Sequence, residues 1–204
     1  MTNCIFDFDG VLARTMEEHV ALRRDCFNEL GSDEEITKRQ RDYFAKPKHS
    51  RKNDLSQEQK DNILKSTQQY AEYMLESQNT IFDEFFAEIT KLNARKSIVS
   101  SNSEAGIRGV LKDKQNMFDH ILGIETSLSK EDKIEIVCDS WQVDSKEVIY
   151  ITDTVSDVLE VSELIGLNNV YGCAWGWSGI DALSKVLPEN QILNHFNDMK
   201  VLVD

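Results

Sequence analysis

The chain opens with a short apolar run that ends in acidic residues. Residues 3–8 are Asn-Cys-Ile-Phe-Asp-Phe, and Asp9-Gly10 interrupts the run. A short apolar stretch that a turn dipeptide ends is typical of a buried strand. We therefore expect a first strand here, with Asp7 and Asp9 at its carboxyl end.

Residues 16–92 show apolar positions at helical spacing instead. Leu22, Cys26 and Leu30 share one helical face. The sequence Gly31-Ser32-Asp33 is expected to end that helix and to cap the next one. Further apolar stripes predict helices near residues 55–75 and 82–92.

After Lys96 the pattern alternates between strands and helices. Strands are expected at residues 97–100, 120–124, 148–152 and 169–174, with helices near 105–111, 133–141 and 158–165. Such alternation predicts an α/β fold with a doubly wound, Rossmann-like parallel sheet. We predict a core domain of residues 1–14 and 94–204, interrupted by an all-helical cap domain of residues 15–93.

Composition narrows the class of protein. With 204 residues, 40% of them hydrophobic, the chain can bury one good core and a smaller appendage. No segment reaches the ~20 apolar residues of a membrane span, and acidic residues break the first apolar run, unlike a secretory signal. Four cysteines without CxxC spacing predict free thiols in a reducing compartment, so a cytoplasmic location is expected.

The charge balance argues against polyanionic partners. The formal net charge is −13, which repels nucleic acids and anionic lipids. We therefore expect neither a nucleic acid nor a membrane as partner. The sequence makes no prediction of oligomeric state.

Polar residues follow three of the expected strands. Asp7 and Asp9 follow the first, Ser101-Asn102 the second, and Asp153 with Asp157 the strand at 148–152. Alone, each is more typical of a turn or a helix cap. Together, at the carboxyl edge of one parallel sheet, they indicate a ligand site. Crowded carboxylates without a His or Cys cluster favour Mg²⁺ as the cation between them.

These residues carry a family resemblance that extends over essentially the whole chain. The segment Asp7-Phe8-Asp9-Gly10-Val11-Leu12 resembles the DxDGxL motif of the haloacid dehalogenase (HAD) superfamily. Residues 98–102 resemble its second motif, and Asp153 to Asp157 its fourth, DxxxD. The loop at residues 174–177 resembles that of phosphoglycolate phosphatase-like members. The third motif is a lysine, for which Lys130 is the first candidate and Lys133 the alternative.

The resemblance implies phosphoryl transfer with a defined set of roles. Asp7 would be the nucleophile that forms an aspartyl-phosphate, and Asp9 the general acid and base. An acid at position 9 disfavours dehalogenation, because the dehalogenase branch lacks it. The roles of phosphate binding and metal binding fall to further residues: Ser101, Asn102 and Lys130 for the phosphoryl group, and Asp7, Asp9, Asp153 and Asp157 for Mg²⁺.

The expected substrate is a small phosphorylated metabolite, and the cap is expected to help select it. Basic residues crowd into residues 38–52. Ser50-Arg51, followed by Leu55, resembles a cap element of relatives whose Arg can touch the substrate. We therefore expect Arg51, and with less support Lys48, to contact substrate.

Two alternatives to a phosphatase stay open. A sugar-phosphate mutase of the β-phosphoglucomutase type is favoured by His19, which matches a His of those enzymes and is a candidate substrate contact. Thr152 and Ser66 argue against a mutase, because those relatives carry Glu and Lys at these positions. A non-catalytic HAD-fold binding protein is the second alternative, although such a protein would be expected to lose Asp7, Asp9 or Asp153.

Overall fold

A single parallel sheet organises the protein. The computed structural model describes residues 1–46, 55–76 and 81–202. Six strands lie in the order β3-β2-β1-β4-β5-β6, and every neighbouring pair is parallel. The strands are β1 (Thr2–Phe6), β2 (Ala94–Val99), β3 (His120–Leu122), β4 (Ile149–Thr152), β5 (Val170–Cys173) and β6 (Ile192–Leu193). The predicted α/β fold with a doubly wound sheet is confirmed.

Helices cover both faces of this sheet. They are α4 (Asp83–Lys91), α5 (Glu104–Leu111), α6 (Lys130–Trp141), α7 (Val155–Ile165) and α8 (Gly179–Leu183), with 3-10 turns η1 (Lys112–Met117), η2 (Ser145–Glu147), η3 (Leu167–Asn169), η4 (Glu189–Gln191) and η5 (Phe196–Leu202). Side chains alternate along a strand, so Cys4 and Phe6 join one apolar core with α4 and α5. Ile5 joins the other core, with α6 and α7.

Most expected elements lie where the pattern placed them, with shifted ends. The strand β2 begins three residues before the predicted one, and β3 stops two residues earlier. The helix α6 begins at Lys130 rather than at residue 133. The two-residue strand β6 was not predicted, because it is too short to show a period.

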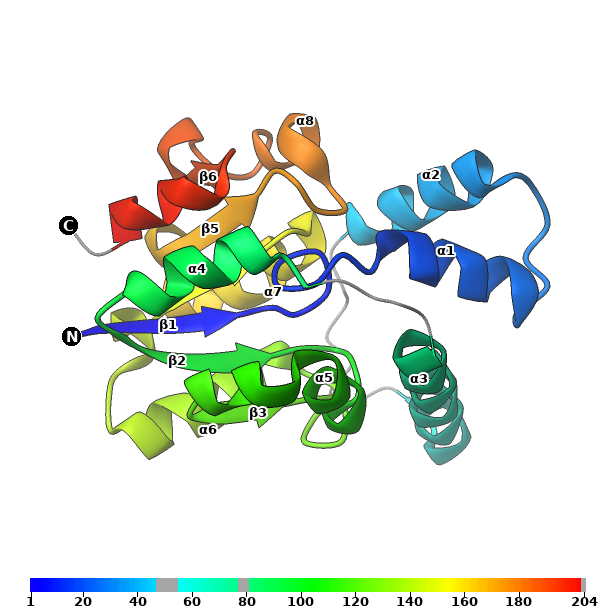
Figure 1. The fold of residues 1–204 in the computed structure, drawn as a ribbon, viewed down its shortest axis with the longest axis horizontal. Helices are drawn as coiled ribbons and strands as arrows, with labels where there is room; N and C mark the ends of the chain where they lie inside the picture. Colours follow the sequence, from blue (N-terminus) through cyan, green and yellow to red (C-terminus); the bar gives the residue numbers. More distant parts are fainter. Residues whose placement is uncertain (47–54, 77–80, 203–204) are drawn as a thin grey trace.

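Three helices of the inserted segment form a separate layer. They are α1 (Met16–Asp25), α2 (Asp33–Phe44) and α3 (Gln57–Glu76). The helices α1 and α3 contact each other, α3 also contacts α5, and all three helices lie beyond the carboxyl ends of the strands (Figure 1). As predicted, Ser32 caps α2, where it forms a capping box with Glu35, but α1 ends at Asp25, before the predicted stop at Gly31.

The helix α4 packs on the sheet. The predicted cap range, residues 15–93, included this helix. Its Phe85 and Phe86 are buried in the core that contains Phe6, and the rings of Phe6 and Phe85 meet edge to face with centroids 6.3 Å apart. The helix also contacts η5. We therefore place α4 with the core, which the apolar spacing of an amphipathic helix alone could not decide.

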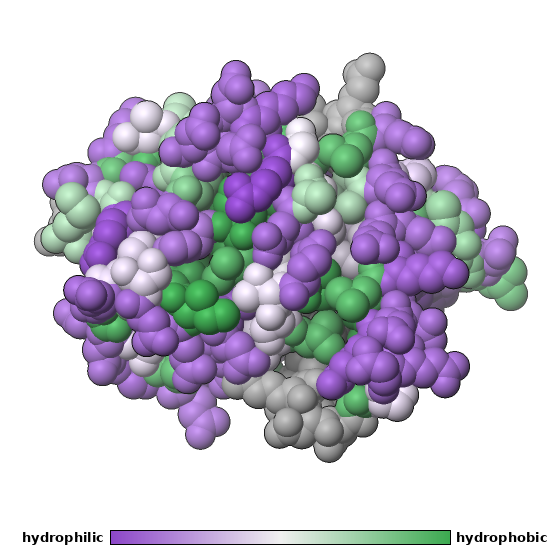
Figure 2. All heavy atoms as spheres, turned by 90° about the horizontal axis from the view of Figure 1, so that it is seen from below, coloured by the Kyte–Doolittle hydropathy of each residue, from purple (hydrophilic) through white to green (hydrophobic). Residues whose placement is uncertain are grey.

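The polarity of the surface agrees with the charged composition of the chain. Seen from the side of α3, α5 and α6, it is mostly hydrophilic, with smaller hydrophobic patches (Figure 2). Across the described part of the chain, no helix combines the length and apolar character needed to span a bilayer. All four cysteines are free thiols.

The packing of α4 predicts a large loss of stability for Phe85→Ala. Phe85 is fully buried, so truncation leaves a cavity and lowers the free energy of unfolding by about 3–5 kcal/mol. Urea unfolding measures this change. Leu30→Ala is the matched control, because Leu30 is 88% exposed, and its loss should stay within about 0.5 kcal/mol. A similar small loss for Phe85→Ala would place α4 outside the core.

Candidate active site

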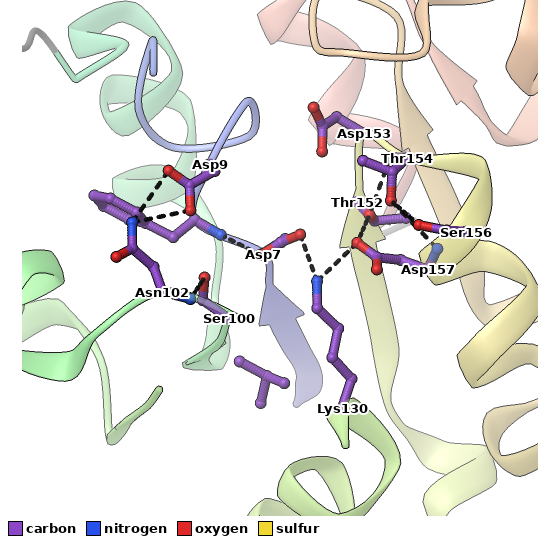
Figure 3. A network of polar contacts seen from close by, with 12 residues as sticks. Asp7, Asp9, Ser100, Asn102, Lys130, Thr152, Asp153, Thr154, Ser156 and Asp157 are labelled. Atoms are coloured by element: carbon purple, nitrogen blue, oxygen red, sulfur yellow. Dashed lines mark hydrogen bonds and ion pairs between the residues drawn. The ribbon is translucent and has the colours of Figure 1, made fainter. Parts of the chain in front are cut away.

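A buried ammonium group joins the residue that follows β1 to the first turn of α7. Lys130, the first residue of α6, places Nζ 2.5 Å from Asp7 Oδ2 and 2.7 Å from Asp157 Oδ2 (Figure 3). It also donates to the Tyr150 hydroxyl at 2.9 Å. Burial by itself lowers the pKa of Lys130, but Asp157 and Asp7 raise this pKa well above its ordinary value. The lysine therefore stays charged between two carboxylates.

The second candidate lysine serves a different purpose. Lys133 Nζ donates to the backbone carbonyls of Ser100, at 2.5 Å, and Gly123, at 3.3 Å. Those carbonyls belong to the segments that follow β2 and β3. Of the two lysines considered from the sequence, Lys130 is the one that reaches the strand-end carboxylates.

Asp7 directly follows β1, an inner strand, so it lies in the middle of the row of carboxyl strand ends. Its backbone N–H donates to the Ile151 carbonyl of β4 at 2.9 Å. Asp7 Oδ1 accepts from the Phe8 N–H at 2.8 Å, and Oδ2 accepts from Lys130. Burial raises the pKa of the Asp7 carboxyl, and the Lys130 ammonium opposes this shift.

Asp153 is buried and only partly paired. Its Oδ2 accepts from the Trp177 N–H at 2.7 Å, but Oδ1 is buried with no hydrogen-bond partner among the described residues. Burial and the nearby Asp7 raise the pKa of Asp153 well above its ordinary value. Asp7 and Asp153 thus line one cavity, and Asp153 contributes a buried oxygen that no described residue pairs.

Two glycines make room for the Asp153 carboxylate. A Cβ at Gly10 would come within 1.9 Å of Asp153 Oδ2, and a Cβ at Gly176 within 2.2 Å of Asp153 Cβ. Gly10 also has φ +73°, a conformation that side chains rarely adopt. The glycine of the first motif therefore lets the chain turn tightly against the second acidic strand end.

The oxygen donors of this site suit a hard divalent cation that takes most of its ligands from water or substrate. Within the described ranges, no group of three or more His, Cys, Asp and Glu side chains is arranged to hold a metal ion. Mg²⁺ is commonly bound by only one or two carboxylates, together with water and phosphate oxygens. The unpaired oxygen of Asp153, close to Asp7, matches that kind of site. Asp157 contacts Lys130 and Thr152 Oγ1, so its part in metal binding stays a prediction.

Asp9 faces the same cavity and is held by two side chains from two parts of the fold. Asn102 Nδ2 donates to its Oδ2 at 3.1 Å and its Oδ1 at 3.3 Å. The Tyr70 hydroxyl of α3 donates to Oδ1 at 3.3 Å. Burial raises the pKa of Asp9, and these hydrogen bonds oppose the shift. The contact from Tyr70 was not predicted, because the sequence shows it only as one member of an apolar helical stripe.

One cavity of about 350 Å³ connects these groups to the cap. Asp7, Asp9, Asp153 and Lys130 line its floor, and the predicted phosphate-binding residues Ser101 and Asn102 line the side after β2. His19 lines the cap side, where Nε2 lies 3.3 Å from Gln40 Oε1. Burial lowers the pKa of His19 to about 4, so the ring is neutral at neutral pH. The predicted substrate contacts Arg51 and Lys48 lie outside the described residues.

The comparison with protein families agrees with this geometry. Residues 4–165 match the model of the haloacid dehalogenase-like hydrolases. The chain belongs to this enzyme family, which confirms the resemblance found in its motifs. A search of the curated proteins gives no significant match.

Solved structures share the fold at low sequence identity. A predicted phosphatase from Clostridium acetobutylicum is 18% identical with a TM-score of 0.71, covering 98% of both chains. A haloacid dehalogenase-like hydrolase from Streptococcus pneumoniae is 20% identical with a TM-score of 0.70, covering 99% of this chain and 97% of that one. CbbY from Rhodobacter sphaeroides, in complex with xylulose-(1,5)-bisphosphate, is 16% identical with a TM-score of 0.67 over the whole of both chains.

The unpaired oxygen of Asp153 predicts opposite effects of Asp153→Asn with and without Mg²⁺. In EDTA the variant should be more stable by about 1–3 kcal/mol, because it removes a buried and incompletely paired charge. Added Mg²⁺ should raise the Tm of the wild type and leave that of the variant nearly unchanged. Thermal unfolding measures both effects. Equal Mg²⁺ responses would remove Asp153 from the metal site, and Asp139→Asn, at an exposed position, is the matched control.

Proposed function

We propose that the protein is a Mg²⁺-dependent phosphatase that hydrolyses a small phosphomonoester through an aspartyl-phosphate on Asp7. The observation that carries this proposal is the buried contact of Lys130 with Asp7 and Asp157, in a cavity that Asp9 also faces. Burial raises the pKa of Asp7 to about 7, and the Lys130 ammonium favours its ionised form, in which it can act as a nucleophile. A second acid in the same cavity can handle the proton of the leaving group.

The first chemical step transfers the phosphoryl group to Asp7. The Ser101 hydroxyl and the Lys130 ammonium bind phosphoryl oxygens and offset their charge. An Asp7 carboxylate oxygen attacks phosphorus while the ester bond to the leaving oxygen breaks. Asp9, whose pKa burial raises, gives its proton to that oxygen, and the alcohol departs.

The second step returns the enzyme to its starting state. Asp9, now a carboxylate, takes a proton from a water molecule as that water attacks the phosphorus of the aspartyl-phosphate. The bond between phosphorus and Asp7 breaks, inorganic phosphate leaves, and Asp9 is protonated again. The Asn102 amide and the Tyr70 hydroxyl keep the Asp9 carboxyl in place through both steps.

Mg²⁺ completes the charge balance of this site. The carboxylates of Asp7 and Asp153 and the backbone carbonyl of Asp9 would hold it, and it would supply positive charge between these carboxylates and the substrate phosphate. The buried, unpartnered oxygen of Asp153 supports this assignment. A similar protein, CbbY, binds a sugar bisphosphate, which agrees with a small phosphorylated substrate here.

The central prediction concerns Asp7→Asn. Loss of the nucleophile should lower kcat by about 10⁴-fold or more for every phosphomonoester hydrolysed with Mg²⁺. Phosphate release from a set of phosphorylated metabolites, with Mg²⁺ or with EDTA, measures this. Asp139→Asn, an exposed carboxylate on α6, should keep the wild-type rate. Undiminished release by Asp7→Asn, or release that EDTA does not change, would refute the proposal.

The same assays separate a phosphatase from a mutase. His19 lines the cavity, which keeps the mutase as the second candidate. A phosphatase releases one phosphate for each substrate consumed, and we expect this result. A mutase would isomerise a sugar phosphate and release little phosphate. Chromatography of the products beside the phosphate assay distinguishes the two.

A further inference from the structure

The cap side of the cavity is built from ring systems. His19 of α1, Phe44 of α2, Tyr70 of α3 and Trp177 of the loop after β5 all line it. The His19 ring meets the rings of Tyr70 and Trp177 edge to face, at a centroid distance of 5.4 Å in each case. The ring centroids of Phe44 and Trp177 lie 5.3 Å apart. We call these four residues the aromatic cluster. Four separate elements thus contribute rings to one wall.

The aromatic cluster lies where a leaving group would be. Tyr70 belongs to it and donates to Asp9, the proposed acid for the leaving oxygen. A phosphoryl group at Asp7 and Lys130 would therefore direct the rest of the substrate past Asp9 toward these rings. The wall continues with Leu22 and Phe27 of the α1 region, so it is largely apolar.

This wall offers little to a second anionic group. Among the described residues that line the cavity, Arg23 is the one basic side chain on the cap side. Its Nε is 2.6 Å from Glu29 Oε2, and its guanidinium lies over the Phe27 ring. Within residues 1–46, 55–76 and 81–202, a second phosphate at the aromatic cluster would lose its water without gaining a matching cation.

Two hydroxyl groups give the wall a polar edge. Ser66 and Thr67 of α3 line the cavity, and both hydroxyls donate to the Ile63 carbonyl, at 2.9 and 3.0 Å. Because each hydrogen is already used, the oxygens are left to accept. A planar heterocycle with N–H groups at its edge could stack on the rings and donate to these oxygens.

We propose that the preferred substrate carries a planar ring on its leaving group, as a nucleoside 5′-monophosphate does. The inference rests on the proposed phosphatase function and specifies its substrate class. The cavity of about 350 Å³ falls at the lower end of the ~300–1,000 Å³ typical of small-molecule sites, which suits one phosphorylated nucleoside.

A matched pair of substrates tests the inference. Adenosine and uridine 5′-monophosphate are compared with methyl β-ribofuranoside 5-phosphate, which keeps the sugar and the 5′ leaving oxygen but has a methyl group in place of the base. With Mg²⁺, kcat/KM for at least one nucleotide should exceed that of the riboside by about tenfold, in keeping with base stacking on aromatic side chains. A ratio below about threefold for both nucleotides would overturn the inference, as would a higher kcat/KM for fructose 1,6-bisphosphate.

Variants of two neighbouring aromatic residues test whether the aromatic cluster causes the preference for nucleotides. Phe44→Leu keeps apolar volume but removes a ring, so it should lower the ratio of nucleotide to riboside by about threefold or more. Tyr43→Leu is the control on the same helix: Tyr43 is half-exposed, does not line the cavity and meets the Phe44 ring edge to face at 5.4 Å, so this variant keeps the Phe44 ring and should change the ratio by less than twofold. An unchanged ratio in Phe44→Leu would contradict a role for the cluster. If that variant does not fold, the wild-type substrate ratio still decides.

The two proposals fail in different ways. Phosphate release that needs Mg²⁺ and Asp7, without preference for the ring-bearing substrates, would overturn the substrate class and leave the phosphatase proposal standing. No release from any phosphomonoester would overturn the phosphatase proposal itself.

Discussion

The ion pairs of Lys130 hold the whole site together, because a buried charge in this position must be compensated on every side. The Lys130 side chain is only 2% exposed, and its ammonium meets the carboxylates of Asp7, just after β1, and of Asp157, in the first turn of α7. Removing one partner from a buried pair commonly destabilises a protein by about 3–5 kcal/mol, since the other charge is left uncompensated. The positions of β1, β4 and the first turn of α6 are therefore coupled through one nitrogen atom. The central place of β1 in the sheet makes this coupling possible.

The acidic groups around Lys130 outnumber it, and this excess defines the chemistry. Asp7 and Asp157 share the ammonium, whereas Asp153 has a backbone partner on one oxygen only. Gly10 and Gly176 let the chain close around that carboxylate. A divalent cation would offset this excess of carboxylates, as in the proposed Mg²⁺ site. The burial of Asp153 thus lowers stability at the position where the proposed metal site would need a carboxylate.

The core and the inserted helices contribute different parts of the site. Under the proposed function, the strand ends supply the charged groups that would act on phosphorus, and these groups would treat any phosphomonoester alike. The helices α1 to α3 close the cavity with rings, and Tyr70 ties that wall to Asp9. Selectivity can therefore change with the inserted helices while the chemistry of the sheet edge stays constant.

The sequence alone determined the fold class and the convergence of the acidic residues. Alternating strands and helices predict a parallel sheet, and the carboxyl ends of parallel strands meet at one edge, so Asp7, Asp9 and Asp153 had to lie close together. Only the tertiary structure decided between Lys130 and Lys133, because residues three apart on a helix share one face and spacing cannot separate them. For the same reason, the sequence did not show that α4 packs on the sheet or that Tyr70 contacts Asp9. Helical periodicity shows which face is apolar, but which partner that face meets depends on contacts between segments far apart in the chain.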